Sequence, residues 1–117
     1  MLHRQELGPA ISDRDLIART AEGDRRAFEL IIERHAAAVL RLATAASDPS
    51  TAEDAMQQTF LSVYQHAASF RGDASVRTWV LTIARNTTYR LRGKTQREEP
   101  VEEPLMELGV DAGWGSE

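Results

Sequence analysis

The sequence has no cysteine, only three histidines and no long apolar run. Without cysteine the chain can form neither a disulfide framework nor a thiolate metal site. His3, His35 and His66 stand far apart without partners at helical spacing, which disfavours a zinc site or a histidine-activated nucleophile. No segment approaches the roughly 18 apolar residues of a membrane span, and the N-terminus lacks a signal-peptide core. We therefore expect a soluble, cytoplasmic, metal-free protein.

Motifs of catalytic chemistry are missing as well. The chain has no G-x-G-x-x-G or P-loop pattern of glycines to hold phosphate groups. Glu53 and Asp54 are adjacent carboxylates at an expected helix start, where the helix dipole explains them without acid–base chemistry. We therefore expect a protein that is not an enzyme and needs no cofactor.

Charge is distributed unevenly over the 117 residues, although the net charge is only −4. Residues 1–66 hold seven basic and ten acidic residues (−3), residues 67–97 seven and one (+6), and residues 98–117 none and seven (−7). Clustered positive charge attracts phosphate groups, so the segment 67–97 is the candidate nucleic-acid surface. The apolar fraction of 42% is typical of a folded domain, and the length suits a single core.

Helix start signals and hydrophobic spacing predict two helices in the first half. A short helix is expected to begin after Ser12 and to end at Gly23. Asp24 is expected to cap a long helix whose inward residues recur at intervals of three and four. These inward residues are Phe28, Ile31, Ile32, His35, Val39, Leu42, Ala43 and Ala46.

A third helix is expected after the break at residues 47–49. Ser50 and Glu53, three residues apart, predict a capping box at its start. Its predicted inward residues are Ala52, Met56, Phe60, Val63, Tyr64 and Ala67.

A loop around Gly72 precedes a fourth helix, expected over roughly residues 75–92 with Asp73 or Ser75 as its cap. Its predicted inward residues are Val76, Trp79, Val80, Ile83, Ala84, Thr87 and Leu91. Beyond Gly93 the sequence is acidic and rich in Pro and Gly, which is typical of a linker. We predict an all-α fold: a compact bundle of about four helices with an acidic, largely irregular C-terminal linker.

Three sequence motifs are more specific than the composition. They are DLIARTAEGDRRAFELIIERH at 15–35, AEDAMQQTFLSVYQ at 52–65 and SFRGDASVRTWVLTIARN at 69–86. In this order and spacing they resemble region two of the extracytoplasmic-function (ECF) sigma factors of bacteria. The resemblance covers roughly residues 13–97, leaving an arm at 1–12 and a linker at 98–117. It implies a domain that binds RNA polymerase core and recognises and melts the promoter minus-ten element.

The resemblance also implies partners and a second domain. The polymerase partner is the pair of clamp helices of the largest catalytic subunit, and the DNA partner is the nontemplate strand. An anti-sigma factor is a further implied partner. In the family a second DNA-binding domain follows the linker, and the sequence stops before it, so we expect a piece of a longer protein.

The polymerase contact of the family lies on the third helix. The matching positions here are Asp54, Gln57 and Gln58, and their spacing lets Asp54 share a helix face with either glutamine. Relatives usually have Glu where this chain has Gln58, which weakens the expected attraction to a basic clamp. The alternative interpretation is a merely solvated helix face.

The DNA contact of the family lies on the loop and the fourth helix, where one flipped base enters a pocket. The matching loop residues are Phe70, Arg71, Gly72, Asp73 and Ala74. Flipping costs a few kcal/mol of stacking, which an apolar wall at Phe70, close approach at Gly72 and the Asn86 amide can offset. Trp79 lies beside Asn86 on the helical wheel. Core packing is the alternative for both aromatic residues.

Basic residues of the segment 67–97 would follow the phosphate backbone, with a solvated helix face as the alternative. They are Arg71, Arg77, Arg85, Arg90, Arg92, Lys94 and Arg97. The competing hypothesis for the whole chain is a helical protein-interaction module whose main partner is an anti-sigma protein. The two differ in whether Arg85→Ala and Asn86→Ala alter nucleic-acid binding.

Overall fold

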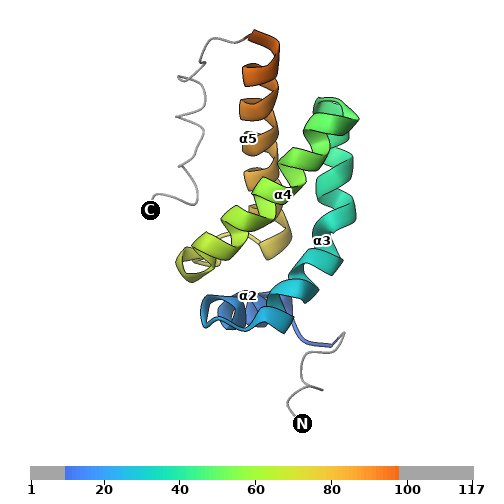
Figure 1. The fold of residues 1–117 in the computed structure, drawn as a ribbon. Coiled ribbons are helices and arrows are strands. Elements are labelled where there is room, and N and C mark those ends of the chain that lie inside the picture. Colours follow the sequence, from blue (N-terminus) through green and yellow to red (C-terminus); the bar gives the residue numbers. More distant parts are fainter. Residues whose placement is uncertain (1–9, 98–117) are drawn as a thin grey trace.

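The structure, a computed structural model, describes residues 10–97, with side chains described as far as residue 94. Within these residues it contains four α-helices, one short 3-10 helix and no strand (Figure 1). The elements are α2 (Asp13–Ala21), α3 (Arg25–Ala46), α4 (Pro49–His66), η1 (Ala67–Ser69) and α5 (Val76–Arg97). The predicted all-α bundle is confirmed, whereas the predicted linker at 98–117 lies outside the described residues.

Side-chain caps set the first two helices, as the sequence predicts. The Ser12 hydroxyl accepts a hydrogen bond from the main-chain N–H of Asp15 at 3.1 Å. The Asp24 carboxylate accepts one from the N–H of Ala27, also at 3.1 Å. Each bond satisfies an N–H group that has no partner within its own helix. Gly23, with a positive φ of 95°, forms the turn between the two helices.

The predicted capping box of the third helix is wrong, because Asp48 caps α4 instead of Ser50. Its carboxylate accepts hydrogen bonds from the main-chain N–H of Thr51 at 2.8 Å and from the Thr51 hydroxyl at 3.2 Å. Pro49 then fits the first helical position, where its missing N–H costs nothing. The two bonds from Thr51 hold the pKa of Asp48 below its ordinary value of 3.8.

The last helix starts where predicted but continues further. Ser75, rather than Asp73, caps α5 by accepting a hydrogen bond from the N–H of Thr78 at 3.0 Å. The helix then runs through Gly93 to Arg97, so the predicted end near residue 92 came too early. A glycine inside a helix costs only about 1 kcal/mol relative to alanine, which neighbouring helical residues and tertiary contacts can offset.

The core lies where α3, α4 and α5 pack together above α2, which crosses their lower end in Figure 1. The largest fully buried side chains are Leu16, Ile17, Ile31, Ile83, Val39, Val63, Val80, Thr59 and Thr88. The predicted stripe of α3 omitted Ala27 and Leu30, which are buried. Tyr64 was predicted to face inward, but it is 44% exposed and stacks against the half-buried Phe28.

Polar contacts join helices that are distant in the sequence. Asp13 of α2 accepts a hydrogen bond from Arg34 at 2.9 Å and lies 2.8 Å from the ring nitrogen Nε2 of the buried His35. Arg92 of α5 donates to the main-chain oxygen of Ala46 at 2.8 Å. These contacts fix α2 against the middle of α3 and α5 against its C-terminal end.

Candidate nucleic-acid interface

A hollow of about 180 Å³ opens where the loop after η1 meets the first turns of α5. Its lining residues are Ser69, Phe70, Arg71, Gly72, Asp73, Ala74, Thr78, Trp79 and Thr82. The five predicted loop residues and Trp79 thus come together around one space. Sequence reasoning missed Ser69, Thr78 and Thr82, although the two threonines flank Trp79 on the helix and could have been found from that spacing.

Two aromatic rings form the apolar wall of the hollow. The ring centroids of Phe70 and Trp79 lie 5.1 Å apart with an angle of 57° between the ring planes. This tilted arrangement is favoured because the edge of one ring meets the face of the other. Trp79 is only 8% exposed, so it is part of the core and of the hollow at once. The two alternatives weighed for Trp79 are therefore compatible.

The rim of the hollow carries polar groups and includes Gly72. Gly72 has a φ of +83°, a left-handed conformation that residues with a Cβ rarely adopt. The exposed Thr78 and the half-buried Thr82 carry hydroxyl groups beside the aromatic wall. An apolar wall with hydroxyls and main-chain groups at the rim can stack a planar ring and form hydrogen bonds with its edge.

Asn86 lies two turns beyond Trp79 on α5 and is not a lining residue of this hollow. Its amide oxygen is buried and has no hydrogen-bond partner in the described part of the chain. Buried polar atoms without partners are rare in folded proteins, because leaving one unpaired costs about 1–3 kcal/mol. The amide oxygen thus has an unused capacity to accept a hydrogen bond but is covered by the surrounding atoms, and a role of Asn86 in base recognition stays a prediction.

The basic side chains of the loop and α5 differ in what they contact. Arg71, Arg77 and Arg85 are exposed. Arg90 is also exposed, but it donates a hydrogen bond to the side-chain oxygen of Gln58 at 3.1 Å. Arg92 is half-buried, bonded to the end of α3 and 5.3 Å from the ring centroid of Tyr89. Arg92 therefore holds α5 against α3, unlike an arginine whose side chain extends into solvent and can contact a phosphate group.

The predicted polymerase-binding residues lie on a different helix. Asp54, Gln57 and Gln58 are all exposed on α4. Gln57 borders an apolar groove of about 740 Å³ between α3 and α4. The groove is lined by Gly23, Arg25, Phe28, Ile32, Met56, Gln57, Phe60, Leu61 and Tyr64. Leu61, 55% exposed, adds to the apolar surface there. Sequence reasoning missed the groove because it assigned Met56 and Tyr64 to the core.

Within residues 10–97, no three His, Asp or Glu side chains are grouped so that they could hold a metal ion. In the same part of the chain, no helix combines the length and apolar character needed to cross a membrane.

The structure defines the class of fold: an all-α helical domain with an aromatic hollow where its loop meets the last helix. Comparison with known proteins gives the family. The family model described as Sigma-70 region 2 matches residues 31–98, which is more than half of the chain. The chain therefore belongs to the sigma-70 family, of which it contains region 2.

Curated relatives agree with this assignment. The chain is 32% identical over 97 residues to the ECF RNA polymerase sigma-E factor of Haemophilus influenzae, covering 83% of this chain and 51% of the relative. It is 40% identical over 95 residues to the ECF RNA polymerase sigma factor SigM of Mycobacterium tuberculosis, covering 79% and 48%. It is 36% identical over 76 residues to the RNA polymerase sigma-H factor of Pseudomonas aeruginosa, covering 64% and 39%. The chain thus spans about half or less of the length of these relatives.

Proposed function

We propose that this chain is the part of a bacterial ECF sigma factor that binds RNA polymerase core and captures the melted minus-ten element of a promoter. The observation that carries the proposal is the hollow of about 180 Å³ between the loop and α5, with its wall of Phe70 and Trp79. Family membership supports the proposal, since relatives of this chain are RNA polymerase sigma factors by name. Such a factor would act in the cytoplasm, where the polymerase works.

The hollow would receive one base flipped out of the nontemplate strand. The tilted rings of Phe70 and Trp79 offer apolar surface against which the base can stack. The hydroxyls of Thr78 and Thr82 and the main chain around Gly72 are close enough to the wall to meet the base edge. The hollow thus selects a base by stacking together with hydrogen bonds at its rim.

Exposed cations would hold the strand on either side of the base. Arg71 lies on the loop, and Arg77, Arg85 and Arg90 lie along α5. Each contact with a phosphate group releases counterions, so each steepens the salt dependence of binding to a single strand by about 0.7 in logarithmic units. We assign Arg92 a structural role first, because its guanidinium already binds the end of α3.

The α4 surface of Asp54, Gln57 and Gln58 would face the polymerase clamp helices. All three residues are exposed on α4, and Gln57 borders the apolar groove that contains Phe28 and Tyr64. A polar helix face next to an apolar groove suits an α-helical partner, whose apolar side fills the groove while its polar side meets the rim. An anti-sigma protein that silences the factor would cover this same surface.

The mechanism needs no bond to be made or broken by this chain. A protein that binds single-stranded bases more tightly than duplex DNA shifts the equilibrium toward the open promoter by that difference in affinity. The polymerase then carries out RNA synthesis. The chain therefore acts as a specificity factor, and it is expected to have no catalytic site.

Fluorescence anisotropy of the full chain with single-stranded oligonucleotides tests the proposal. Nontemplate sequences are selected from a randomised pool, and binding is then titrated with salt. Phe70→Ala is expected to weaken binding of the selected strand roughly tenfold through lost stacking, and Asn86→Ala to reduce sequence preference. Phe28→Ala, which removes a half-buried phenylalanine from the groove on α3, is the matched control and should leave DNA binding unchanged.

Binding of variants to core polymerase is the complementary measurement. Asp54→Ala and Phe28→Ala should weaken polymerase binding, whereas Phe70→Ala should not. Binding of DNA without sequence preference, unchanged by Phe70→Ala and Asn86→Ala, would remove the flipped-base pocket from the proposal. The chain would then be a protein-interaction module with a basic face.

A further inference from the structure

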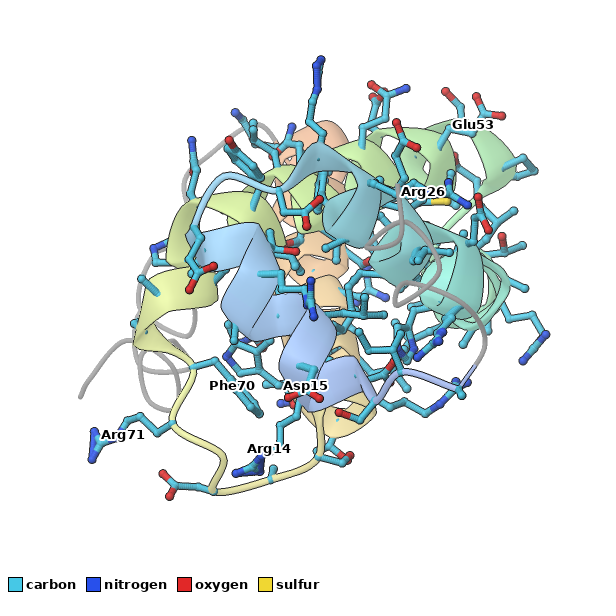
Figure 2. The ribbon with its side chains drawn as sticks, turned by 90° about the horizontal axis from the view of Figure 1, so that it is seen from below. Arg14, Asp15, Arg26, Glu53, Phe70 and Arg71 are labelled. Atoms are coloured by element: carbon cyan, nitrogen blue, oxygen red, sulfur yellow. The ribbon has the colours of Figure 1, made fainter. Side chains whose placement is uncertain are left out.

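We propose that Arg14 of α2 is a positioning residue of the DNA site, because its guanidinium supports the loop at Gly72 and holds that loop in place beside Trp79. The proposal rests on the proposed function, since it takes the hollow to be a base pocket. It adds a residue from the first helix to a site otherwise built from the loop and α5. Figure 2 shows Arg14 reaching from α2 toward the loop beside Phe70, whereas Arg71 points outward.

The Arg14 guanidinium lies so close to Gly72 that a side chain at residue 72 would force it to shift. A Cβ built on Gly72 would lie 2.6 Å from one terminal guanidinium nitrogen of Arg14, 3.1 Å from the other and 3.2 Å from the central carbon. The whole planar group therefore lies where a side chain of residue 72 would begin. The glycine serves two purposes: it adopts a φ of +83°, and it leaves room for the guanidinium.

The loop around Gly72 is held by side-chain contacts: Phe70 packs against Trp79, and Arg71 Nε lies 4.0 Å from the Asp73 carboxylate. On its α2 side lies a second hollow of about 400 Å³, to which Arg14 and Ile17 contribute from α2. Phe70, Arg71 and Gly72 line both this hollow and the one beside Trp79, so the loop is a thin wall between two spaces. In the described chain, no main-chain group of residues 72–74 forms a hydrogen bond with another main-chain group. A side-chain contact therefore has a large share in fixing the loop.

Among the described residues, Arg14 has no ion pair that would draw it away from the loop. The residue before Arg14, Asp13, is bound to Arg34 and His35 of α3, which fixes the first turn of α2. The backbone at Arg14 is therefore fixed. The contact of its side chain with Gly72 then fixes the position of the loop relative to α2. A planar guanidinium can lie flat against a main-chain segment, whereas a lysine ammonium cannot.

Two readouts on the full chain test the proposal. The first is base discrimination: the ratio of affinities for the selected oligonucleotide and for the same strand with an abasic site at the selected base. The second needs no DNA. The chain has two tryptophans, Trp79 and Trp114, so in a Trp114→Phe background acrylamide quenching reports on the solvent access of Trp79 alone.

Arg14→Ala and Arg14→Lys are both expected to lower base discrimination about tenfold and to raise the quenching of Trp79. Arg41→Ala, which removes another exposed arginine from the C-terminal half of α3, is the matched control and should change neither. Thermal unfolding followed by circular dichroism verifies that each variant is folded, which is expected because Arg14 is exposed.

Two results would overturn the proposal. In the first, Arg14→Ala leaves both Trp79 quenching and base discrimination at the wild-type values. In the second, Arg14→Ala lowers base discrimination but leaves Trp79 quenching at the wild-type value, which would mean that the charge acts on DNA and that loop support is not needed. If the wild-type chain itself fails to discriminate the abasic strand, the proposed base pocket is wrong. The acrylamide quenching of Trp79 then shows by itself whether Arg14 supports the loop.

Discussion

Gly72 is the residue on which the conformation of the loop depends most directly. Gly72→Ala should lower the free energy of unfolding by about 1–2 kcal/mol, because a residue with a Cβ is strained in the left-handed region. It should also lower base discrimination, because the new methyl group displaces the Arg14 guanidinium. Urea unfolding and oligonucleotide binding measure the two effects.

Gly23→Ala is the matched control for this substitution. Gly23 has a similar φ of +95°, but a Cβ there would meet nothing within 4 Å. Both variants should lose comparable stability, and only Gly72→Ala should lose base discrimination. Equal losses of discrimination in the two variants would show that the displacement of Arg14 has no part in it.

At the scale of the helix, Asp48 makes the start of α4 sensitive to acid. Its pKa is lowered by the hydrogen bonds from Thr51, so the folded state favours the charged carboxylate more than the unfolded state does. The resulting stabilisation is complete above the ordinary pKa of 3.8 and is lost as the pH falls through the lower folded value. Asp48→Asn retains a good capping group that does not titrate.

The measurement is a set of urea unfolding curves for both proteins at about pH 6 and about pH 2.5. Wild type should lose more stability than Asp48→Asn over this interval. Parallel losses in the two proteins would contradict the assignment of acid sensitivity to this cap.

The link between α2 and α3 is the second contact at this scale. Asp13→Ala removes the carboxylate that contacts Arg34 and the buried His35, whose other ring nitrogen already has no partner in the described residues. The loss should lower the free energy of unfolding by about 1–3 kcal/mol and speed hydrogen exchange in α2. Asp15→Ala, an exposed carboxylate in the same first turn, is the matched control. Similar effects in both variants would reduce the role of Asp13 to helix-dipole stabilisation.

At the scale of the whole molecule, much of the helical framework could be predicted because short-range signals define it. Ser12 and Asp24 cap their helices as predicted, since each precedes a clear hydrophobic period. The cap of α4 was misassigned because Asp48 and Ser50 are both good capping residues, and only the backbone at Pro49 decides between them. The end of α5 was misplaced because Gly93 was taken to end the helix, whereas a glycine inside a helix costs only about 1 kcal/mol.

The candidate site could be predicted in part, chiefly through resemblance. The loop residues and Trp79 were placed by family motifs, and the structure brings them around one hollow. Periodicity alone could not show that Tyr64 faces a groove, because an apolar stripe can face either a core or a partner. Arg14 escaped prediction because its contact with Gly72 joins segments that are far apart in the sequence.

The dual position of Trp79 limits how such a domain can acquire a new promoter preference. One side of the indole belongs to the packed interior and the other to the hollow. Replacing it to suit another base would therefore weaken folding as well. The exposed lining residues Arg71, Asp73, Ala74 and Thr78 carry no such burden, so these four positions form an exchangeable cassette. Engineers who want altered specificity should randomise that cassette and retain the tryptophan.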